Sequence, residues 1–293
     1  MTVYVAVAEE ESFAGAARRL GMSPPAVTRA VASLEDRLGI KLLNRTTRLV
    51  RATDAGLRYL EHARRIIAEA DEADEAAAGV NAEPRGQLAV TAPVLFGRMF
   101  VTPSIVEYLR RFPEMTITAM LLDRVVNLLE EGLDVGIRIG ELPDSTMNAI
   151  GVGHVRLVAC ASPDYLKAHG VPRVPADLTR HTVIAATPVS PSVEWRFVTD
   201  KKTISVKVKP RLTVTNNEAA IVAAVQGFGV TRLLSYQMAP YLASGQLKRV
   251  LSEYEPPRLP IHVLHREGRQ ASAKVRTFVD LLVERLRTDK ALS

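Results

Sequence analysis

Two short helical patterns joined by a glycine are the feature that most restricts how this chain can fold. Ser12 is a good N-cap, and the apolar residues after it recur at the spacing of one helix face. Gly21 can adopt the left-handed conformation that ends such a helix. Ser23 can cap a second helix, with Pro24 at its first position, where a missing N–H has no cost. The pattern predicts a helix-turn-helix within residues 12–39.

A basic β-hairpin is predicted directly after these helices. Residues 42–43 and 49–50 are apolar pairs on either side of a polar tip. Arginines at such a tip reach phosphates or the minor groove of DNA, and the exposed start of a recognition helix meets base edges. The candidate DNA-binding residues are therefore Ser23, Pro24, Pro25, Thr28, Arg29, Arg45, Thr46 and Arg48. The alternative is a solvated polar face on an all-helical core.

Positive charge is concentrated in the same segment. Residues 12–58 contain nine basic and three acidic residues, so their net charge of +6 equals that of the whole 293-residue chain. Such asymmetry is expected where one domain meets a polyanion and another does not. Aromatic residues make up only 5% of the chain, which argues against a stacking platform for single-stranded nucleic acid. Double-stranded DNA is the partner that this segment favours.

Residues 5–56 resemble the DNA-binding segment of the LysR-type bacterial transcriptional regulators. The stretches that carry the resemblance are 5–9, 12–13, 16–20, 23–29, 34–35, 38–39, 42–48 and 53–56. The resemblance implies a winged helix-turn-helix, a sequence-specific regulator of transcription, and RNA polymerase as a further partner. Members of the family usually carry several more residues before Val3, so a short first helix is expected here.

A continuous helical pattern follows from residue 57 to about residue 79. Its small and apolar residues have the spacing of a coiled-coil seam, formed by Leu60, Ala63, Ile67, Ala70, Asp74 and Ala77. A solvated single helix is the alternative. In the resembling family this helix joins two chains, which implies a homodimer, an inverted-repeat operator and, in many members, a homotetramer.

Beyond residue 86, strand and helix patterns alternate, which predicts an α/β fold with mainly parallel sheets. Strands are expected at residues 116–121 and 135–139, with a helix at residues 125–131 between them. Two lobes with crossing connections resemble a periplasmic-binding-protein fold, which is the architecture of the LysR-type effector domain.

Three domains are therefore expected. A winged helix-turn-helix domain takes residues 1–56, and a linker helix with a hinge takes residues 57–85. A two-lobed, periplasmic-binding-protein-like α/β effector domain takes residues 86–293. Its first lobe comprises about 86–156 and 261–286, and its second lobe comprises about 157–260.

Ligands of such folds bind between the lobes, at the carboxyl ends of strands and the N-termini of helices. The candidate effector-binding residues at these places are Thr91, Pro93, Leu95, Phe96, Asp123, Arg138, Asn217, Gly227 and Phe228. Free backbone N–H groups after Pro93, with Arg138 nearby, suit a small carboxylate; the alternative role of Arg138 is a salt bridge that locks the lobes. Many relatives have a small hydroxyl residue at the position of Leu95. Leu95 and Phe96 therefore predict an apolar cleft mouth and a partly apolar or aromatic acid.

The sequence contains no nucleophile, base or metal-ligand set at a spacing that would support catalysis, so no enzyme is expected. No cofactor is expected besides the small-molecule effector. The single cysteine, Cys160, fits a reducing compartment, and neither a secretion signal nor an apolar run of about 20 residues is found. A cytoplasmic protein with no membrane partner is expected. The alternatives are a transporter's solute-binding protein, which needs an export signal, and a nucleoid-type DNA binder, which has no use for the large α/β domain.

Overall fold

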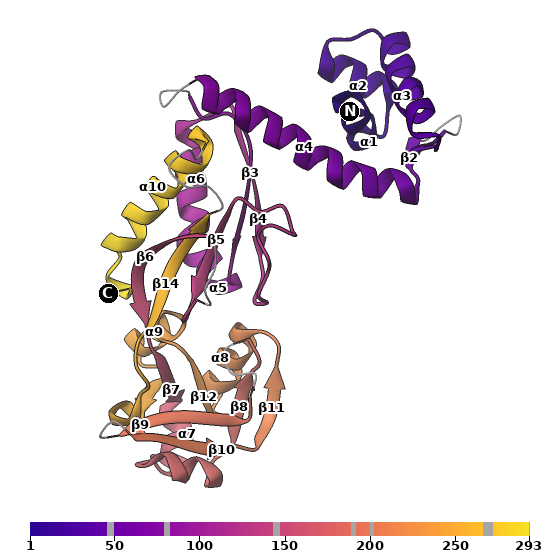
Figure 1. Cartoon of the computed structure of the whole chain (residues 1–293). Helices are drawn as coiled ribbons and strands as arrows, with labels where there is room; N and C mark the ends of the chain where they lie inside the picture. Colours follow the sequence, from indigo (N-terminus) through magenta and orange to yellow (C-terminus); the bar gives the residue numbers. More distant parts are fainter. Residues whose placement is uncertain are drawn as a thin grey trace. The chain divides into compact units, whose positions relative to one another are not determined.

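The structure is a computed structural model that describes residues 1–45, 50–78, 83–142, 147–188, 192–199, 202–265 and 272–292. It contains two compact units, Met1–Ala82 and Glu83–Ser293, each of which is described by itself (Figure 1). Within the described ranges, no helix combines the length and the apolar composition that a membrane span requires.

The first unit is a three-helix core followed by a hairpin and a long helix. In chain order its elements are α1 (Thr2–Glu10), α2 (Phe13–Leu20), α3 (Pro24–Leu38), β1 (Leu43–Arg45), β2 (Val50–Ala52) and α4 (Asp54–Ala78). β1 and β2 are antiparallel, with Arg45 opposite Val50. The predicted helix-turn-helix is formed by α2 and α3, and both strands of the predicted hairpin are present. Residues 46–49, at its tip, lie outside the described residues.

The ends of these helices follow from local sequence. Ser12 Oγ accepts a hydrogen bond from the Gly15 N–H at 3.1 Å, and Thr53 Oγ1 accepts one from the Gly56 N–H at 2.9 Å. Gly21 ends α2 in the left-handed conformation, at a φ of 62°. Ser23 occupies the N-cap position of α3, but its side chain accepts no capping hydrogen bond. Pro25, at the N2 position, has no N–H for such a bond, and the Ala26 N–H donates to the Ser23 carbonyl oxygen at 2.9 Å.

The core of the first unit depends on a close approach between α4 and the chain just before the hairpin. A Cβ atom at Gly56 would lie 2.1 Å from the carbonyl oxygen of Leu42, so only glycine fits there. The buried Tyr4 side chain of α1 donates a hydrogen bond from its hydroxyl to the Gly56 carbonyl oxygen at 2.9 Å. Helix α1, the hairpin and α4 are thereby tied at one point.

The first half of α4 is part of this core. Ala63 is buried, and Leu60 and Ile67 pack partly buried against the same cluster of apolar side chains. Half of the expected coiled-coil seam is therefore used within one chain, because α4 must cover the apolar side of the small three-helix core. Leu57 and Ile66 are 56% and 50% exposed and are the large apolar side chains that this helix leaves uncovered among its described residues.

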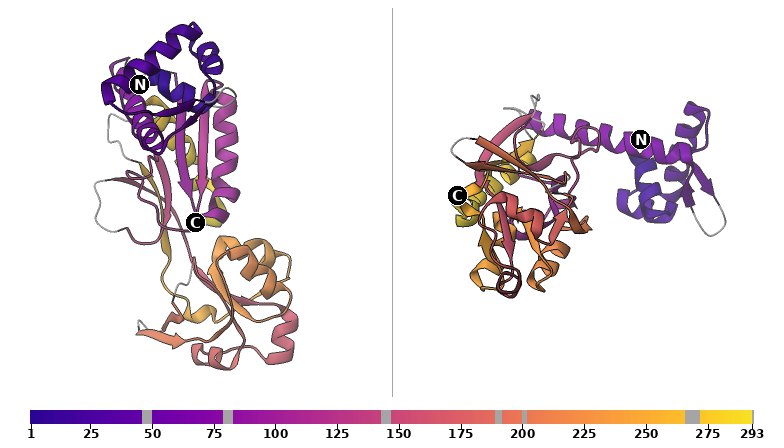
Figure 2. Two further views of the ribbon diagram at one scale, coloured as in Figure 1. Left: turned by 90° about the vertical axis from the view of Figure 1, so that its right-hand side faces the viewer. Right: turned by 90° about the horizontal axis from the view of Figure 1, so that it is seen from below.

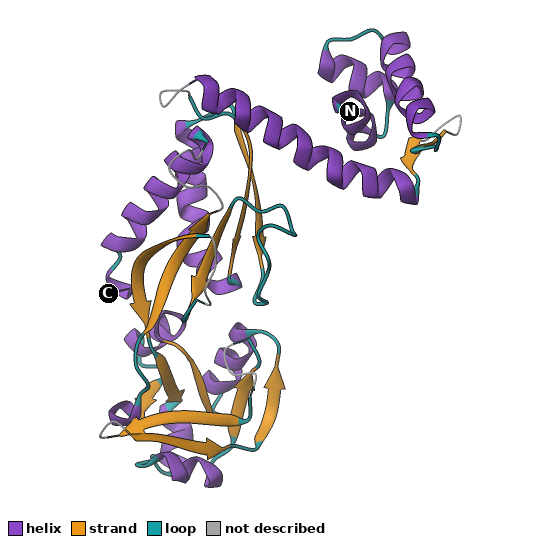
Figure 3. Ribbon diagram, viewed as in Figure 1, coloured by secondary structure: helices purple, strands orange, loops and turns teal. Residues whose placement is uncertain are grey.

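The second unit has two lobes, each built on a five-stranded sheet (Figures 2 and 3). The elements of lobe I are β3 (Gly86–Ala92), α5 (Val94–Phe96), a π-helical segment (Gly97–Val101), α6 (Thr102–Arg111), β4 (Met115–Leu121), β5 (Val135–Ile139), β6 (Asn148–Val155), β14 (Leu259–His265), α10 (Ala273–Thr288) and a 3-10 turn (Lys290–Leu292). The strand order is β4-β3-β5-β14-β6, with α6 and α10 packed on the sheet.

Lobe II repeats this plan with an added hairpin. Its elements are β7 (Leu157–Ala161), α7 (Pro163–His169), a 3-10 helix (Pro175–Arg180), β8 (Val183–Ala186), β9 (Glu194–Thr199), β10 (Lys202–Lys207), β11 (Pro210–Val214), α8 (Asn217–Val225), β12 (Val230–Leu234), α9 (Ser235–Ala243), β13 (Lys248–Val250) and a 3-10 turn (Ser252–Tyr254). The strand order is β11-β8-β12-β7-β13, and β9 and β10 form a separate antiparallel pair. The two-lobed α/β architecture is as predicted.

The prediction of mainly parallel sheets is wrong. In lobe I, β3 is parallel to β4 and β5, but β14 is antiparallel to β5 and β6. In lobe II, β8 is parallel to β11 and β12, but β7 is antiparallel to β12 and β13. Helical crossovers within a lobe give the parallel pairs, whereas the chain's crossings between the lobes bring in strands that run the other way.

The helix predicted at residues 125–131 is also wrong. The segment makes a single turn, in which the Glu131 N–H donates to the Asn127 carbonyl oxygen at 3.0 Å. The Asn127 side chain accepts a second hydrogen bond, from the Leu129 N–H at 3.1 Å, and so stabilises a turn instead of a helix. Gly132 then adopts a left-handed conformation, at a φ of 64°, that stops further helical growth.

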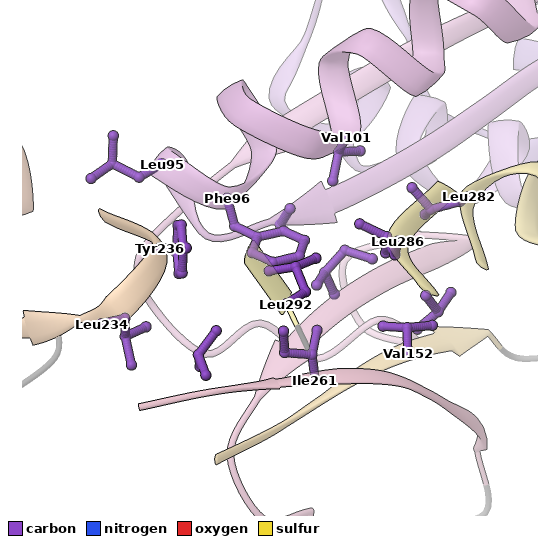
Figure 4. Close-up of a cluster of buried hydrophobic side chains, with 14 of the residues drawn as sticks. Leu95, Phe96, Val101, Val152, Leu234, Tyr236, Ile261, Leu282, Leu286 and Leu292 are labelled. Atoms are coloured by element: carbon purple, nitrogen blue, oxygen red, sulfur yellow. The ribbon is translucent and has the colours of Figure 1, made fainter. Parts of the chain in front are cut away.

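Side chains from both lobes share one hydrophobic core, part of which is drawn in Figure 4. The ring of Phe96, in α5 of lobe I, lies 5.4 Å from the ring of Tyr236, in α9 of lobe II. Phe100 contacts both rings, at 4.8 Å and 5.6 Å between centroids. The lobes are thus held together by aromatic packing as well as by the chain crossings.

Candidate nucleic-acid interface and ligand cavity

The first two turns of α3 bring together five of the predicted DNA-binding residues. Ser23, Pro24, Pro25 and Arg29 are exposed, and Thr28 is half-buried with its Oγ1 donating to the Pro24 carbonyl oxygen at 3.0 Å. A hydroxyl bound to its own helix in this way has a fixed rotamer but keeps acceptor capacity. These turns form a compact, polar and exposed surface at one end of α3.

The remaining predicted DNA contacts belong to the hairpin. Arg45 is the last residue of β1, but its side chain lies outside the described part of the chain. Thr46 and Arg48 lie outside it altogether. Their role as phosphate contacts stays a prediction.

Some basic residues of this unit already form ion pairs within the chain, and others keep their charge available for a polyanion. Arg19 pairs with Glu9 at 2.7 Å, and Arg64 of α4 pairs with the same carboxylate at 2.8 Å. Burial opposes ionisation of Glu9, but the hydrogen bonds from the two guanidinium groups outweigh it and lower the pKa of Glu9. Arg29 has no ion-pair partner among the described residues, so its charge is available on the exposed start of α3.

A buried carboxylate that the sequence analysis did not single out anchors the hairpin. Glu35 of α3 is 2% exposed, and its Oε1 accepts hydrogen bonds from the N–H groups of Leu42 and Leu43, at 2.9 and 3.1 Å. Its Oε2 accepts from Lys41 Nζ at 2.8 Å. Burial opposes ionisation, but these three donors prevail and hold the pKa of Glu35 below its ordinary value. The sequence signal that could have revealed its burial is its position four residues after Val31, on the inward face of α3.

The second unit contains a cavity of about 210 Å³ between its two lobes. It is lined by the loops after β3 and β4, by β5, and by the starts of α8 and α9. The lining residues are Pro93, Leu122, Asp123, Arg124, Val125, Ile137, Arg138, Ile139, Leu157, Pro188, Asn217, Leu234, Tyr236, Gln237 and Leu259. Mostly apolar walls with a few polar groups are typical of a small-molecule site.

Four of the nine predicted effector-binding residues line this cavity, namely Pro93, Asp123, Arg138 and Asn217. Thr91 is not among the lining residues; it is buried in β3, where its Oγ1 donates to the Met120 carbonyl oxygen at 2.8 Å. These residues come from strand ends and helix starts of both lobes, as the fold rule for two-lobed α/β domains predicts.

Leu95 and Phe96 do not form the mouth of this cavity. Both are buried in the hydrophobic core, where Phe96 packs on Tyr236. The helical segment after Pro93 turns these two side chains into the core and leaves Val94 partly exposed. Gly227 and Phe228 are also absent from the lining. Gly227 ends α8 at a φ of 79°, and the Phe228 ring lies under the Arg211 guanidinium, 5.5 Å from it.

The first of the N–H groups expected to be free after Pro93 is already bound. Asp123 Oδ1 accepts a hydrogen bond from the Val94 N–H at 3.0 Å, so the chain's own carboxylate occupies the start of the helical segment. Arg138 donates from its Nη2 to the Val126 carbonyl oxygen, and burial lowers its pKa. Arg138 therefore holds the 125–131 turn within lobe I.

An ion pair does connect the lobes, but through other residues. Arg98, in the π-helical segment of lobe I, pairs with Glu218 of α8 in lobe II. Both side chains are exposed, so this pair contributes little stability.

Reactive chemistry is not apparent in the part of the chain that the structure describes. No group of three or more His, Cys, Asp or Glu side chains is arranged there to hold a metal ion. Cys160 is buried in lobe II, and burial raises the pKa of its thiol to about 12, which keeps it protonated.

Comparison with known families and proteins agrees with this geometry. Residues 1–57 match the bacterial regulatory helix-turn-helix family of LysR type, and residues 81–287 match the LysR substrate binding domain. An HTH-type transcriptional regulator of Xanthomonas campestris pv. campestris (strain 8004) is 35% identical over 291 residues, covering 98% of this chain and 85% of the relative.

Two solved structures resemble the whole chain. That of CrgA, a LysR-type transcriptional regulator from Neisseria meningitidis, has a TM-score of 0.63 at 30% identity and covers 97% of each chain. That of the Vibrio cholerae virulence activator AphB has a TM-score of 0.64 at 23% identity, covering 96% of this chain and 97% of that one, and supports the fold alone. With both family matches and these relatives, the chain belongs to the LysR-type transcriptional regulators and carries their substrate-binding domain.

Proposed function

We propose that the chain binds an inverted-repeat DNA operator through the start of α3 and the hairpin. The observation that carries this proposal is the cluster of exposed polar residues on the first two turns of α3. Its cation, Arg29, has no ion-pair partner among the described residues. An exposed helix start on a rigid small core can enter the major groove, while the hairpin contacts the flanking backbone. Glu35 supports this arrangement because it fixes the base of the hairpin to α3.

Nuclease footprinting of the DNA beside the chain's own gene tests this proposal. We expect protection of two half-sites related by a dyad and about one helical turn apart. Protection without any repeat would favour a nucleoid-type binder instead. The interlobe cavity argues against that alternative, since a protein that only coats DNA needs no small-molecule site.

Two chains pair through α4 in this proposal, along a seam that shares Ala70 and Ala77 with the one the sequence favoured but begins at Ile66. Leu60, Ala63 and Ile67 are used in the core of the first unit. Ile66 and Ala70 are exposed on a neighbouring stripe, and the sequence continues their spacing at residues 73 and 77. Small residues on this stripe permit close helix contact, and two such dimers would form the homotetramer.

A matched pair of variants tests the seam. Leu57 lies nine residues before Ile66, which places it on the opposite side of α4. Ile66→Arg is expected to shift the chain toward monomer in sedimentation velocity, whereas Leu57→Arg leaves its oligomeric state unchanged. Equal behaviour of the two variants would place the dimer contact elsewhere.

We also propose that a small acid binds in the interlobe cavity and controls whether the regulator is in its active or inactive conformation. Arg138 donates one N–H to the Val126 carbonyl oxygen and retains further N–H donors at the cavity wall. Apolar lining from side chains such as Leu122, Ile137 and Leu259 suits a partly apolar molecule. A ligand that bridges the lobes would shift the population of lobe arrangements and so the setting of paired DNA-binding units. Isothermal titration of the full chain against a panel of carboxylates is the test, and binding by none of them would refute the acid.

A further inference from the structure

The polar groups that line the interlobe cavity fall into two classes. Gln237 is satisfied, because its Oε1 accepts from the Leu234 N–H at 3.1 Å and its Nε2 donates to the Tyr236 hydroxyl at 3.2 Å. Arg124 donates twice to Glu131, at 2.7 Å each. These groups need nothing from a ligand.

Two lining side chains keep unused acceptor capacity. Asn217, the first residue of α8, is 3% exposed, and its Oδ1 is buried without a hydrogen-bond partner in the described part of the chain. Asp123 uses only Oδ1, for the Val94 N–H. Its carboxylate has no ion-pair partner among the described residues. Buried acceptors in native proteins are nearly always paired, so an unpaired one at a cavity wall indicates a missing donor.

The charged side chains that line the cavity indicate a ligand that carries both a positive and a negative charge. Asp123 offers a carboxylate that has no ion-pair partner among the described residues. Arg138 offers a half-buried guanidinium that donates to the neutral Val126 carbonyl oxygen and feels the charge of Glu131 without forming an ion pair with it among the described residues. A simple carboxylate would satisfy Arg138 and leave Asn217 Oδ1 and Asp123 Oδ2 without a donor among the described residues. An ammonium group placed between Asn217 and Asp123 supplies that donor and neutralises the carboxylate.

We propose that the effector of this cavity is a small amino acid-like zwitterion, with its ammonium group bound by Asn217 and Asp123 and its carboxylate bound by Arg138. The volume fits, since about 210 Å³ holds roughly seven waters at about 30 Å³ each. This inference rests on the proposed function of the cavity as an effector site.

The test is isothermal titration of the full chain with matched probes. The probes are L-alanine, L-serine, L-valine, L-leucine and L-phenylalanine, each beside its 2-hydroxy acid and its unsubstituted acid. We expect at least one amino acid to bind about tenfold or more tightly than its unsubstituted analogue, because a site built around a donor rejects a ligand that lacks it. Binding by no amino acid, or equal binding by the matched plain acid, would overturn the proposal.

Variants tie that discrimination to the two acceptors. Asp123→Asn retains an oxygen for the Val94 N–H but removes the charge, and Asn217→Leu removes the second acceptor at similar volume. Each is expected to reduce the preference for the amino acid at least about tenfold, whereas Asp164→Asn, on the exposed start of α7, leaves it unchanged. Full discrimination in both cavity variants would overturn the assignment. Operator protection by the ligand-free chain is measured separately, so failure here is distinct from failure of DNA binding.

Discussion

Removal of the Glu35 carboxylate should lower the local stability of the hairpin while the helices stay folded. Glu35→Ala leaves the N–H groups of Leu42 and Leu43 without their acceptor and removes the partner of Lys41. Each buried N–H left unsatisfied costs about 1–3 kcal/mol, so two cost at least about 2 kcal/mol. Lys41 is 70% exposed, and its ion pair adds no more than about 1 kcal/mol.

Hydrogen–deuterium exchange of the full chain measures this loss directly. A loss of about 2 kcal/mol corresponds to roughly 30-fold faster exchange of the Leu42 and Leu43 amides, at about 1.4 kcal/mol per tenfold. Glu35→Gln is the matched control, because its amide oxygen still accepts from both N–H groups and only the ion pair is lost. It should change exchange less than about fivefold. Unaltered protection in Glu35→Ala would refute the anchoring role of this residue.

The same carboxylate gives the hairpin a predictable dependence on pH. The pKa of Glu35 is lowered in the folded chain, so its stabilisation is present above its unfolded pKa of about 4.3. It is lost as the pH falls through the lower, folded pKa. Protection of the Leu42 amide in the native chain should therefore be constant from pH 7 to pH 5, and should decline only in more acidic solution.

Three further outcomes follow from burial and exposure. Cys160 in the native chain should react with a thiol-specific disulfide reagent only as fast as lobe II opens, because its pKa is raised to about 12; rapid labelling at pH 8 would contradict this. Gly56→Ala should unfold the first unit, since its Cβ would lie 2.1 Å from the Leu42 carbonyl oxygen, and a normal circular-dichroism melt would contradict it. Arg98→Ala should lower the stability of the second unit by no more than about 1 kcal/mol in urea titration, because its pair with Glu218 is exposed.

Local signals in the sequence predicted the first unit well. Ser12 and Gly21 determine helix ends through a cap and through backbone conformation, which depend on residues close in sequence. The polar start of α3 was predictable for the same reason. Glu35 was missed as an anchor because its partners lie seven and eight residues away in a hairpin whose position relative to α3 is a tertiary property.

The second unit shows where such signals end. The alternation of strands and helices predicted an α/β fold, but strand direction depends on where the chain crosses between lobes, as for β14. Asp123 was placed in the ligand loops, yet its hydrogen bond to Val94 depends on two loops meeting in space. Leu95 is apolar enough for either a cleft or a core, and only the packing of α5 decides between them.

The salt dependence of operator binding tests most directly whether α3 reads DNA. Arg29→Ala should weaken binding and reduce the slope of log affinity against log salt by about one unit, because one phosphate contact is lost. Arg37→Ala, in the last turn of the same helix, is the matched control and should leave the slope unchanged. An unaltered slope in Arg29→Ala, or an equal reduction in both variants, would contradict the placement of DNA at the start of α3.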